Sequence, residues 1–198
     1  MTFDCKTVLA AIVLLAGCIG LAHAEAVEPS DSTRSASGRT SSAFSAGSYL
    51  STYRGKRTIS YRGSHRPGTI VISTRRRTLD YVLPNGKAIR YGIGVGREGY
   101  QWGGSTRVAR KAEWPGWTPP AAMRRRQPYL PTYMPGGINN PLGARALYLG
   151  GSLYRIHGTN QPHTIGHAVS SGCIRMVNAE VIDLYNRVRV GAPVVVIR

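Results

Sequence analysis

The side chains best suited to chemistry gather in one short stretch, IHGTNQPHTIGHAVSSGCIRM, which covers residues 156–176. It holds three histidines and one cysteine among glycines and small polar residues. Such a combination allows three interpretations: a metal site, a nucleophile with its base, or a glycine-rich loop that happens to contain a cysteine.

The nucleophile interpretation starts from Cys173. Gly172 precedes it, so the backbone can approach a substrate carbonyl, and neighbouring N–H groups can stabilise an oxyanion. A free thiol is only slightly ionised at neutral pH, and a histidine beside it raises the thiolate fraction. His157 ends the predicted strand LYRIH, a rigid position from which to aim an imidazole. His163 and His167 fall in a loop, where we expect accessory or surface residues.

The metal interpretation uses the pattern H-x5-H-x3-H-x5-C, whose residues can all ligate zinc. Two histidines at i and i+4 face one way only on a helix, and Pro162 and Gly166 argue against a helix through PHTIGH. We therefore expect neither a metal site nor a cofactor. A buried and inert cysteine remains the alternative to a reactive one.

The N-terminal segment has the features of a secretory signal. Lys6 precedes an apolar run over residues 8–21, and the tripeptide AHA offers small residues at the two positions that a signal peptidase reads. The run is short for a bilayer-spanning helix, so residues 1–24 are interpreted as a removable signal peptide. The alternative is the lipobox-like sequence LAGC, which would leave a lipid on Cys18, although the sequence stays apolar beyond it.

Cleavage after residue 24 removes Cys5 and Cys18 and leaves Cys173 as the single cysteine of the exported chain. A lone cysteine has no internal disulfide to form, which favours a free reactive thiol or an intermolecular pair. Residues 25–66 follow, rich in Ser, Gly, Arg and Thr and without apolar periodicity. This composition predicts a flexible tether.

The chain is strongly basic, with 26 lysines and arginines against 9 acidic residues and a formal net charge of +17. An exported protein meets cell-wall and envelope polymers rather than nucleic acid, so we expect an anionic partner in the periplasm or cell envelope. A solvated basic face without a specific partner is the alternative.

Short β-rich runs predict a mostly β domain that begins near Pro67. The sequence PNGK between two such runs is a hairpin signal. One helix is predicted near the C-terminus, with Asn178 as its cap and Glu180 in its first turn. The expected strands lie in TIVIST, TLDYVL, AIRYGIGVG, RALYLGG, SLYRIHG and PVVVIR.

Residues 97–143 form a long Gly/Pro-rich stretch that we expect to be an irregular lid or binding loop. Its Trp114 and Trp117 either wall a substrate cleft or pin the loop to the domain. The preceding GVGREG fits the dinucleotide-binding pattern G-x-G-x-x-G. No helical periodicity follows it, so we reject that interpretation.

The stretch HGTNQPHTIGHAVSSGCIRM closely resembles the signature of the YkuD-type L,D-transpeptidases, bacterial enzymes that remodel peptidoglycan. The match consists of His157-Gly158, then Ser170-Ser171-Gly172-Cys173, then an apolar residue and Arg175. The resemblance extends over residues 67–198, including GIGVGREG and the closing VGAPVVVI. It implies a catalytic domain that is mostly β with one or more helices, in a β-sandwich or barrel-like arrangement.

The resemblance also implies a mechanism. Cys173 would attack the third residue of a stem tetrapeptide, expel the terminal D-alanine and pass the acyl group to an amine, with His157 as base and Gly158, Ser170, Ser171 and Gly172 in support. Many family members have histidine where this chain has Ser171, so a mechanism that needs that second histidine cannot operate here.

The candidate substrate contacts are Arg175, Tyr154, Trp114 and Trp117. The alternative for Arg175 is a structural ion pair. Peptidoglycan stems are the implied partners, with a second stem, an outer-membrane protein or a free D-amino acid as possible acceptor. The family resemblance further implies that carbapenem-type β-lactams acylate Cys173. A basic wall-binding module without catalysis is the alternative function.

Overall fold

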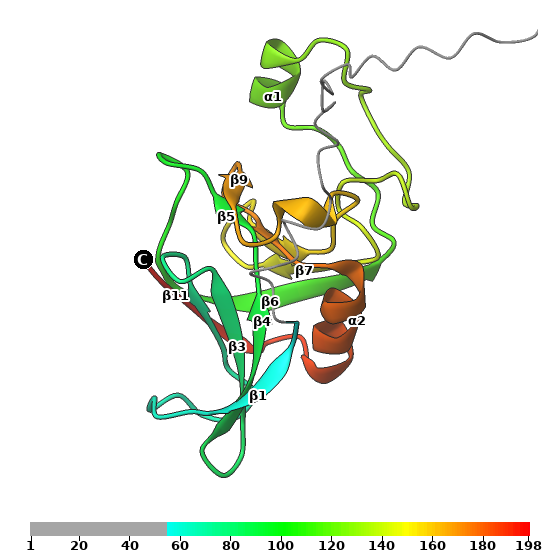
Figure 1. Ribbon diagram of the computed structural model, residues 1–198. Helices are drawn as coiled ribbons and strands as arrows, with labels where there is room; N and C mark the ends of the chain where they lie inside the picture. The colour runs from blue at the N-terminus through cyan, green and yellow to red at the C-terminus, as the bar shows by residue number, and fades with distance from the viewer. Residues whose placement is uncertain (1–54) are drawn as a thin grey trace, which may run out of the picture. The chain divides into compact units, whose positions relative to one another are not determined.

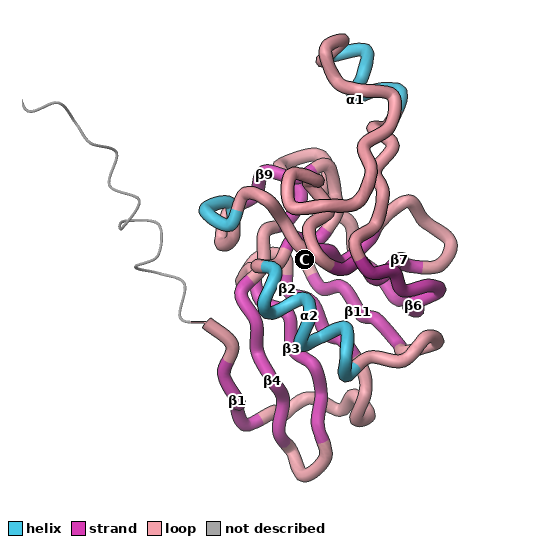
Figure 2. The backbone as a smooth tube through the Cα atoms, turned by 90° about the vertical axis from the view of Figure 1, so that its right-hand side faces the viewer, coloured by secondary structure: helices cyan, strands magenta, loops and turns pink. Residues whose placement is uncertain are grey.

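The computed structural model describes residues 55–198. The expected signal peptide, the lipobox and residues 25–54 of the expected tether lie outside the described residues. The described chain is mostly β with two α-helices, which confirms the predicted fold class (Figures 1 and 2). The strands are β1 (Arg57–Ser60), β2 (Ile70–Ser73), β3 (Thr78–Leu83), β4 (Lys87–Gly92), β5 (Val95–Gly96), β6 (Gly104–Glu113), β7 (Arg145–Leu149), β8 (Arg155–His157), β9 (Ala168–Ser170), β10 (Ile174–Arg175) and β11 (Pro193–Ile197); the helices are α1 (Ala121–Arg126), α2 (Asn178–Arg187) and a 3-10 turn, η1 (Pro162–Thr164).

Nine strands form one curled sheet in the order β1-β4-β3-β2-β11-β6-β7-β8-β10, and β5 pairs with β9 in a second sheet of two strands. β6 belongs to both halves of the large sheet. Its part up to Arg107 pairs with β11, and its part from Val108 onwards pairs with β7. The long strand therefore ties the N-terminal half of the domain to the half that carries the HGTN…SSGC motif.

Helix α2 covers one face of this sheet and completes the core (Figure 2). The buried apolar residues come from both halves of the sheet and from α2, so a single core joins these elements. They include Ile70, Ile72, Leu79, Tyr91, Leu147, Ile156, Ile174, Met176, Val181 and Leu184.

The hairpin between β3 and β4 forms where PNGK predicts it. Asn85 and Gly86 both have positive φ, 60° and 64°. Two consecutive residues with positive φ match the twist of antiparallel strands, and Asn-Gly is the pair that adopts them most readily. The turn sets the register that pairs Leu83 with Lys87.

Two predicted boundaries differ from the structure. The expected tether contains a strand near its end: Arg57–Ser60 pairs with β4 as the edge of the sheet, so the sheet begins ahead of Pro67. The expected irregular stretch over residues 97–143 contains the ten-residue strand β6. Only Val108 of that strand is buried, so it lacks the alternation of apolar residues by which strands are detected.

Helix α2 also starts differently from its prediction. Val177 is the N-cap residue and Asn178 is the first helical residue, with no side-chain hydrogen bond capping the helix. The amide of Asn178 instead accepts hydrogen bonds from two loops outside the helix. Val181 and Leu184 face the core as their helical spacing predicts.

Asp183 fixes the outer face of α2 to the β1–β4 edge. Its carboxylate accepts hydrogen bonds from Tyr91 Oη at 2.6 Å, Lys56 Nζ at 2.8 Å and Arg187 at 3.0 Å. The Arg187 guanidinium, and then Lys56 and Tyr91, hold the pKa of the Asp183 carboxyl well below its ordinary value.

Within residues 55–198, no helix is long and apolar enough to cross a membrane.

Replacing Asp183 by Asn should lower the free energy of unfolding by about 2 kcal/mol at pH 7, because three charged or hydroxyl donors lose a carboxylate acceptor. Urea denaturation would measure this. As a control, the exposed Glu98→Gln should change the free energy by less than about 0.5 kcal/mol. Equal effects of the two substitutions would contradict the role of Asp183.

Candidate active site

The parallel pairing of β8 with β10 brings the two ends of the chemical motif together. Ile156 lies opposite Ile174, and His157 lies opposite Arg175. Both isoleucines are buried in the core, so His157 and Arg175 project from the other face of the sheet. Cys173 directly precedes β10, and continuing the alternation of the strand by one residue puts it on the side of Arg175. The site is therefore set by strand register, across sixteen residues of intervening loop.

His157 is buried, with 4% of its surface exposed, and its Nδ1 lies 2.6 Å from the carbonyl oxygen of Gly158. Burial, followed by the charge of Arg175, lowers the pKa of His157 to about 3. The ring is thus neutral near pH 7. A carbonyl oxygen can only accept a hydrogen bond, so the contact with Gly158 favours the proton on Nδ1. The backbone of Leu142 also interacts with the ring.

The turn that supplies this carbonyl is held by Asn178. Its Oδ1 accepts hydrogen bonds from the N–H groups of Ala144 (3.0 Å) and Thr159 (3.2 Å). A Cβ at Gly158 or at Gly143 would lie 2.2 Å from that oxygen, so both positions require glycine. One amide from the start of α2 thereby fixes the backbone next to His157.

The loop before Cys173 is fixed by Ser170. The buried Ser170 hydroxyl donates to the Cys173 carbonyl at 2.6 Å and accepts from the Gly172 N–H at 3.2 Å. Both bonds span the SSGC turn, so the hydroxyl closes it. The half-buried Ser171 lies between these two anchored residues.

Gly172 packs against an aromatic pair. Its φ is +107°, and a Cβ there would lie 2.3 Å from Cε1 of Tyr154. Tyr154 in turn stacks on Trp102, with ring centroids 4.7 Å apart, and Trp102 Nε1 donates to the Gly172 carbonyl at 2.9 Å. Tyr154, predicted as a substrate contact, therefore packs under the Cys173 loop.

The glycines of GIGVG serve the same loop. Gly96 on β5 lies opposite Ser170 on β9. A Cβ on Gly96 would lie 2.6 Å from the Tyr100 carbonyl oxygen and 3.2 Å from the Gly172 Cα. Gly94 exchanges two backbone hydrogen bonds with Arg175, both 2.9 Å. The glycine spacing that mimics a dinucleotide fingerprint thus allows close backbone approach to the SSGC turn.

Arg175 lies close enough to Cys173 for their charges to interact. It is half-buried, and its Nε is buried without a hydrogen-bond partner. Burial lowers the pKa of Arg175, and a negative charge on Cys173 opposes this shift.

The remaining predicted residues lie elsewhere. Trp114 directly follows β6, and Trp117 exchanges two backbone hydrogen bonds with Met134 at the base of the projecting segment that carries α1 (Figure 1). His163 lies in the 3-10 turn η1, and His167 follows it, with both side chains exposed. Over residues 55–198, no three His, Cys, Asp or Glu side chains cluster in a way that could hold a metal ion.

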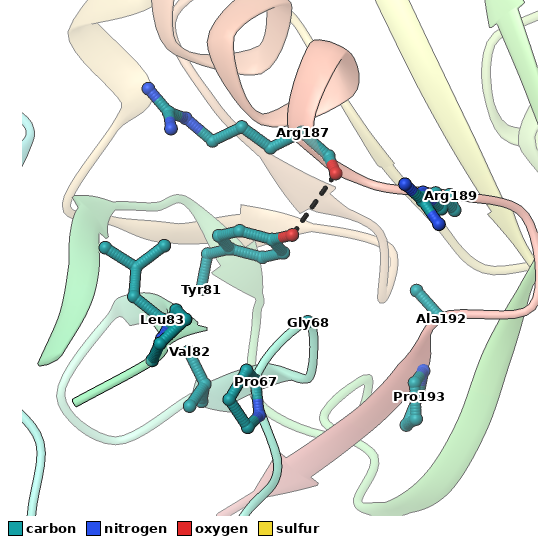
Figure 3. A pocket seen from close by; sticks show the side chains of 10 residues that line it. Pro67, Gly68, Tyr81, Val82, Leu83, Arg187, Arg189, Ala192 and Pro193 are labelled. Atoms are coloured by element: carbon teal, nitrogen blue, oxygen red, sulfur yellow. Dashed lines mark hydrogen bonds between the residues drawn. The ribbon is translucent and has the colours of Figure 1, made fainter. Parts of the chain in front are cut away.

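A hollow of about 470 Å³ lies away from these residues, between the β2–β3 region and the segment joining α2 to β11 (Figure 3). Tyr81 forms part of its wall and donates its hydroxyl proton to the Arg187 carbonyl at 3.2 Å. None of the predicted site residues lines it.

Sequence reasoning missed Trp102 and the part played by Asn178. Trp102 contacts a residue seventy positions away, and no local pattern signals that contact. Asn178 carried a signal that was interpreted as a helix cap. Two features could have indicated that Asn178 fixes a loop. It lies just after the motif, and position 158 is a glycine.

Residues 67–196 match the sequence model of YkuD, the L,D-transpeptidase catalytic domain. The match covers more than half of the chain, and the chain therefore belongs to the YkuD family.

Among curated relatives, the Probable L,D-transpeptidase ErfK/SrfK of Escherichia coli K12 is 39% identical over 137 residues, which cover 65% of this chain and 43% of that protein. The chain thus spans less than half the length of this relative. A solved structure from Brucella melitensis, described as a probable carnitine operon oxidoreductase, is 42% identical with a TM-score of 0.51, covering 71% of this chain and 92% of that one. An L,D-transpeptidase from Mycobacterium smegmatis shares the fold at 17% identity and a TM-score of 0.50, covering 66% of this chain and 58% of that one.

Replacing Gly172 by Ala should lower the free energy of unfolding by about 2 kcal/mol or more, because the new methyl group collides with Tyr154 and φ is unfavourable. The matched control is Gly99→Ala, which has a similar positive φ of +77° with no atom within 4 Å. That variant should cost about 1 kcal/mol. Urea denaturation of both variants measures the difference, and equal losses would contradict the packing role of Tyr154.

The buried neutral His157 should make the fold sensitive to acid. Its pKa in the folded chain is about 3, below the ordinary value of about 6.5, so the unfolded chain binds the extra proton between these values. Stability should fall as pH is lowered from about 6.5 towards 3, with a slope from this residue of up to about 1.4 kcal/mol per pH unit. Denaturation curves should give a shallower slope for His157→Gln, and an unchanged slope would contradict the assignment.

Proposed function

We propose that this chain is a peptidoglycan L,D-transpeptidase with Cys173 as nucleophile and His157 as general base and acid. The observation that carries the proposal is the strand register that pairs His157 with Arg175, two residues after Cys173, together with the contact between His157 Nδ1 and the Gly158 carbonyl. Membership of the YkuD family supports the same reaction class.

The first half-reaction makes a thioester. Nε2 of His157 takes the thiol proton as Sγ of Cys173 attacks the carbonyl of the third stem residue. The C–N bond to the terminal D-alanine then breaks, and the proton passes from His157 to the departing amine. In the second half-reaction an acceptor amine attacks the thioester, the C–S bond breaks, and the proton returns to Cys173. One amide bond is exchanged for another, so no ATP is needed outside the cytoplasm.

The oxyanion of each step needs N–H donors near Cys173. The Gly172 N–H is already bonded to Ser170 Oγ, which leaves the N–H groups of Ser171 and Cys173 as the candidate donors in the motif. Arg175 adds positive charge near Cys173, where it can attract a substrate carboxylate.

The proposal includes export and an anionic environment. A signal peptide over residues 1–24, or a lipid on Cys18, would deliver the chain to the periplasm or cell envelope. The net charge of +17 suits contact with carboxylate-bearing wall polymers. The acyl acceptor is then a second stem peptide or an outer-membrane protein.

Two other functions fit less well. A basic wall-binding module would not need a buried neutral histidine paired in register with Arg175, two residues after the cysteine. The description of the Brucella structure names an oxidoreductase. The glycine pattern of this chain does not support that activity. The stretch Gly94-x-Gly96-x-x-Gly99 leads from β5 towards β6, whereas a dinucleotide site requires a helix directly after it.

The test is release of D-alanine from a synthetic tetrapeptide stem, with mass spectrometry of the protein to detect the thioester. Replacing Cys173 by Ser should lower release by about three orders of magnitude or more and abolish the adduct, because the hydroxyl is a far weaker nucleophile. A carbapenem should acylate the parent chain and not this variant.

Cys173→Ser changes one atom, so its thermal midpoint should match that of the parent chain and serve as the folding control. Cross-linking of stems by this variant would contradict the nucleophile assignment. Binding of the parent chain to cell-wall sacculi without any D-alanine release would favour the wall-binding module.

A further inference from the structure

A second row of side chains crosses the sheet face that carries Cys173 and His157. On the large sheet, Arg110 of β6 lies opposite Tyr148 of β7, and Tyr148 lies opposite Arg155 of β8. The parallel register of β8 and β10, continued by one residue, puts Cys173 next to Arg155. Residues opposite each other across neighbouring strands project from the same face. The row therefore leads from the proposed nucleophile to Arg110.

Arg110 reaches this face because β6 is irregular. Val108 pairs with Leu149 and Arg110 pairs with Tyr148, so Ala109 is an extra residue without a partner. In a regular strand Val108 and Arg110 would project from one face. The bulge instead leaves Val108 buried in the core and turns Arg110 to the opposite, exposed face. Bulges next to active sites commonly redirect a side chain in this way.

Both guanidinium groups converge on one aromatic ring. The Cζ of Arg110 lies 3.7 Å from the Tyr148 ring centroid, and the Cζ of Arg155 lies 5.5 Å from it. Stacking on a ring orders a guanidinium while its N–H edge remains available to an anion. The ring therefore acts as a platform that orients two cations.

Within residues 55–198, neither cation forms a salt bridge. The salt bridges within residues 55–198 use Lys56, Arg90, Arg145 and Arg187, and none involves Arg110 or Arg155. Arg155 donates one hydrogen bond, to the Leu153 carbonyl, and its Nε is buried with no acceptor. Two like charges on one ring repel each other, and a bound anion would relieve that repulsion.

We infer that Arg110, Tyr148 and Arg155 form a carboxylate-binding subsite for the acyl donor. The inference rests on the proposed function. Strands lie about 4.8 Å apart, so Tyr148 and Arg110 are roughly 10–14 Å across the sheet from Cys173. The second stem residue begins about 3.3 Å from the attacked one, and a carboxylate-bearing branch on it extends further, towards the Tyr148 end of this span. The subsite would thus hold a free carboxylate of the stem on the N-terminal side of the attacked carbonyl, on the second residue.

The acyl donor is the favoured occupant because it stays attached to Cys173 through both half-reactions. A fixed subsite on this face of the sheet can hold the acyl donor throughout, while the leaving group departs and the acceptor takes its place. The electrostatic link to the chemistry is direct, since the positive charge of Arg155 contributes to lowering the pKa of His157.

The test compares two tetrapeptide stems, one with a free carboxylate on the second residue and one with a carboxamide there. The parent chain should release D-alanine from the carboxylate peptide with a kcat/KM about tenfold higher, as expected for a charge-assisted hydrogen bond. Arg110→Gln should remove this preference by lowering kcat/KM about tenfold for the carboxylate peptide while changing the carboxamide peptide less than about twofold.

The matched control is Arg75→Gln, which removes one positive charge from the exposed turn between β2 and β3 and should keep the preference. Equal turnover of the two peptides by the parent chain would overturn the subsite while leaving the proposed function intact. An equal loss on both peptides in Arg110→Gln would show a structural role for Arg110 and would also overturn it. Failure of the parent chain to release D-alanine from either peptide would overturn the proposed function itself.

Discussion

The site depends on the parallel pairing between two very short strands, β8 and β10. These strands are separated by a loop that contains a 3-10 turn and the strand β9, yet their register decides which face carries His157 and Arg175. A shift by one residue would send these two side chains into the core and bring Ile156 or Ile174 out of it. The buried isoleucines therefore specify the register, and the register aligns the polar groups.

The mostly β fold and its position in the chain could be predicted from local patterns. TLDYVL, PNGK and the spacing of Val181 and Leu184 each carry a signal within a few residues, and the structure agrees with all three. β1 and β6 were missed for one reason. Both are polar strands whose place in the sheet comes from their partners, β4 for the first and β11 and β7 for the second.

The chemical motif could be predicted as a set of residue types but not as an arrangement. The sequence indicates that Cys173 needs a histidine, and it favours His157 because that residue ends a strand. It does not indicate that Trp102 and Asn178 fix the two loops concerned, since both contacts join segments that are distant in the chain. Tyr154 illustrates the converse, because an aromatic residue near a motif suggests a ligand contact and here packs beneath the motif's glycine.

The partner that orients His157 is a main-chain carbonyl, not a carboxylate side chain. No single substitution can delete that oxygen, since every amino acid at position 158 would bring one. Only the course of the backbone can be altered, and it is controlled by the tight packing of two glycines around one amide. Substitutions at these glycines would therefore inactivate the site by displacing the carbonyl oxygen that orients the His157 ring. A sequence search for lost polar side chains would not detect such inactive homologues.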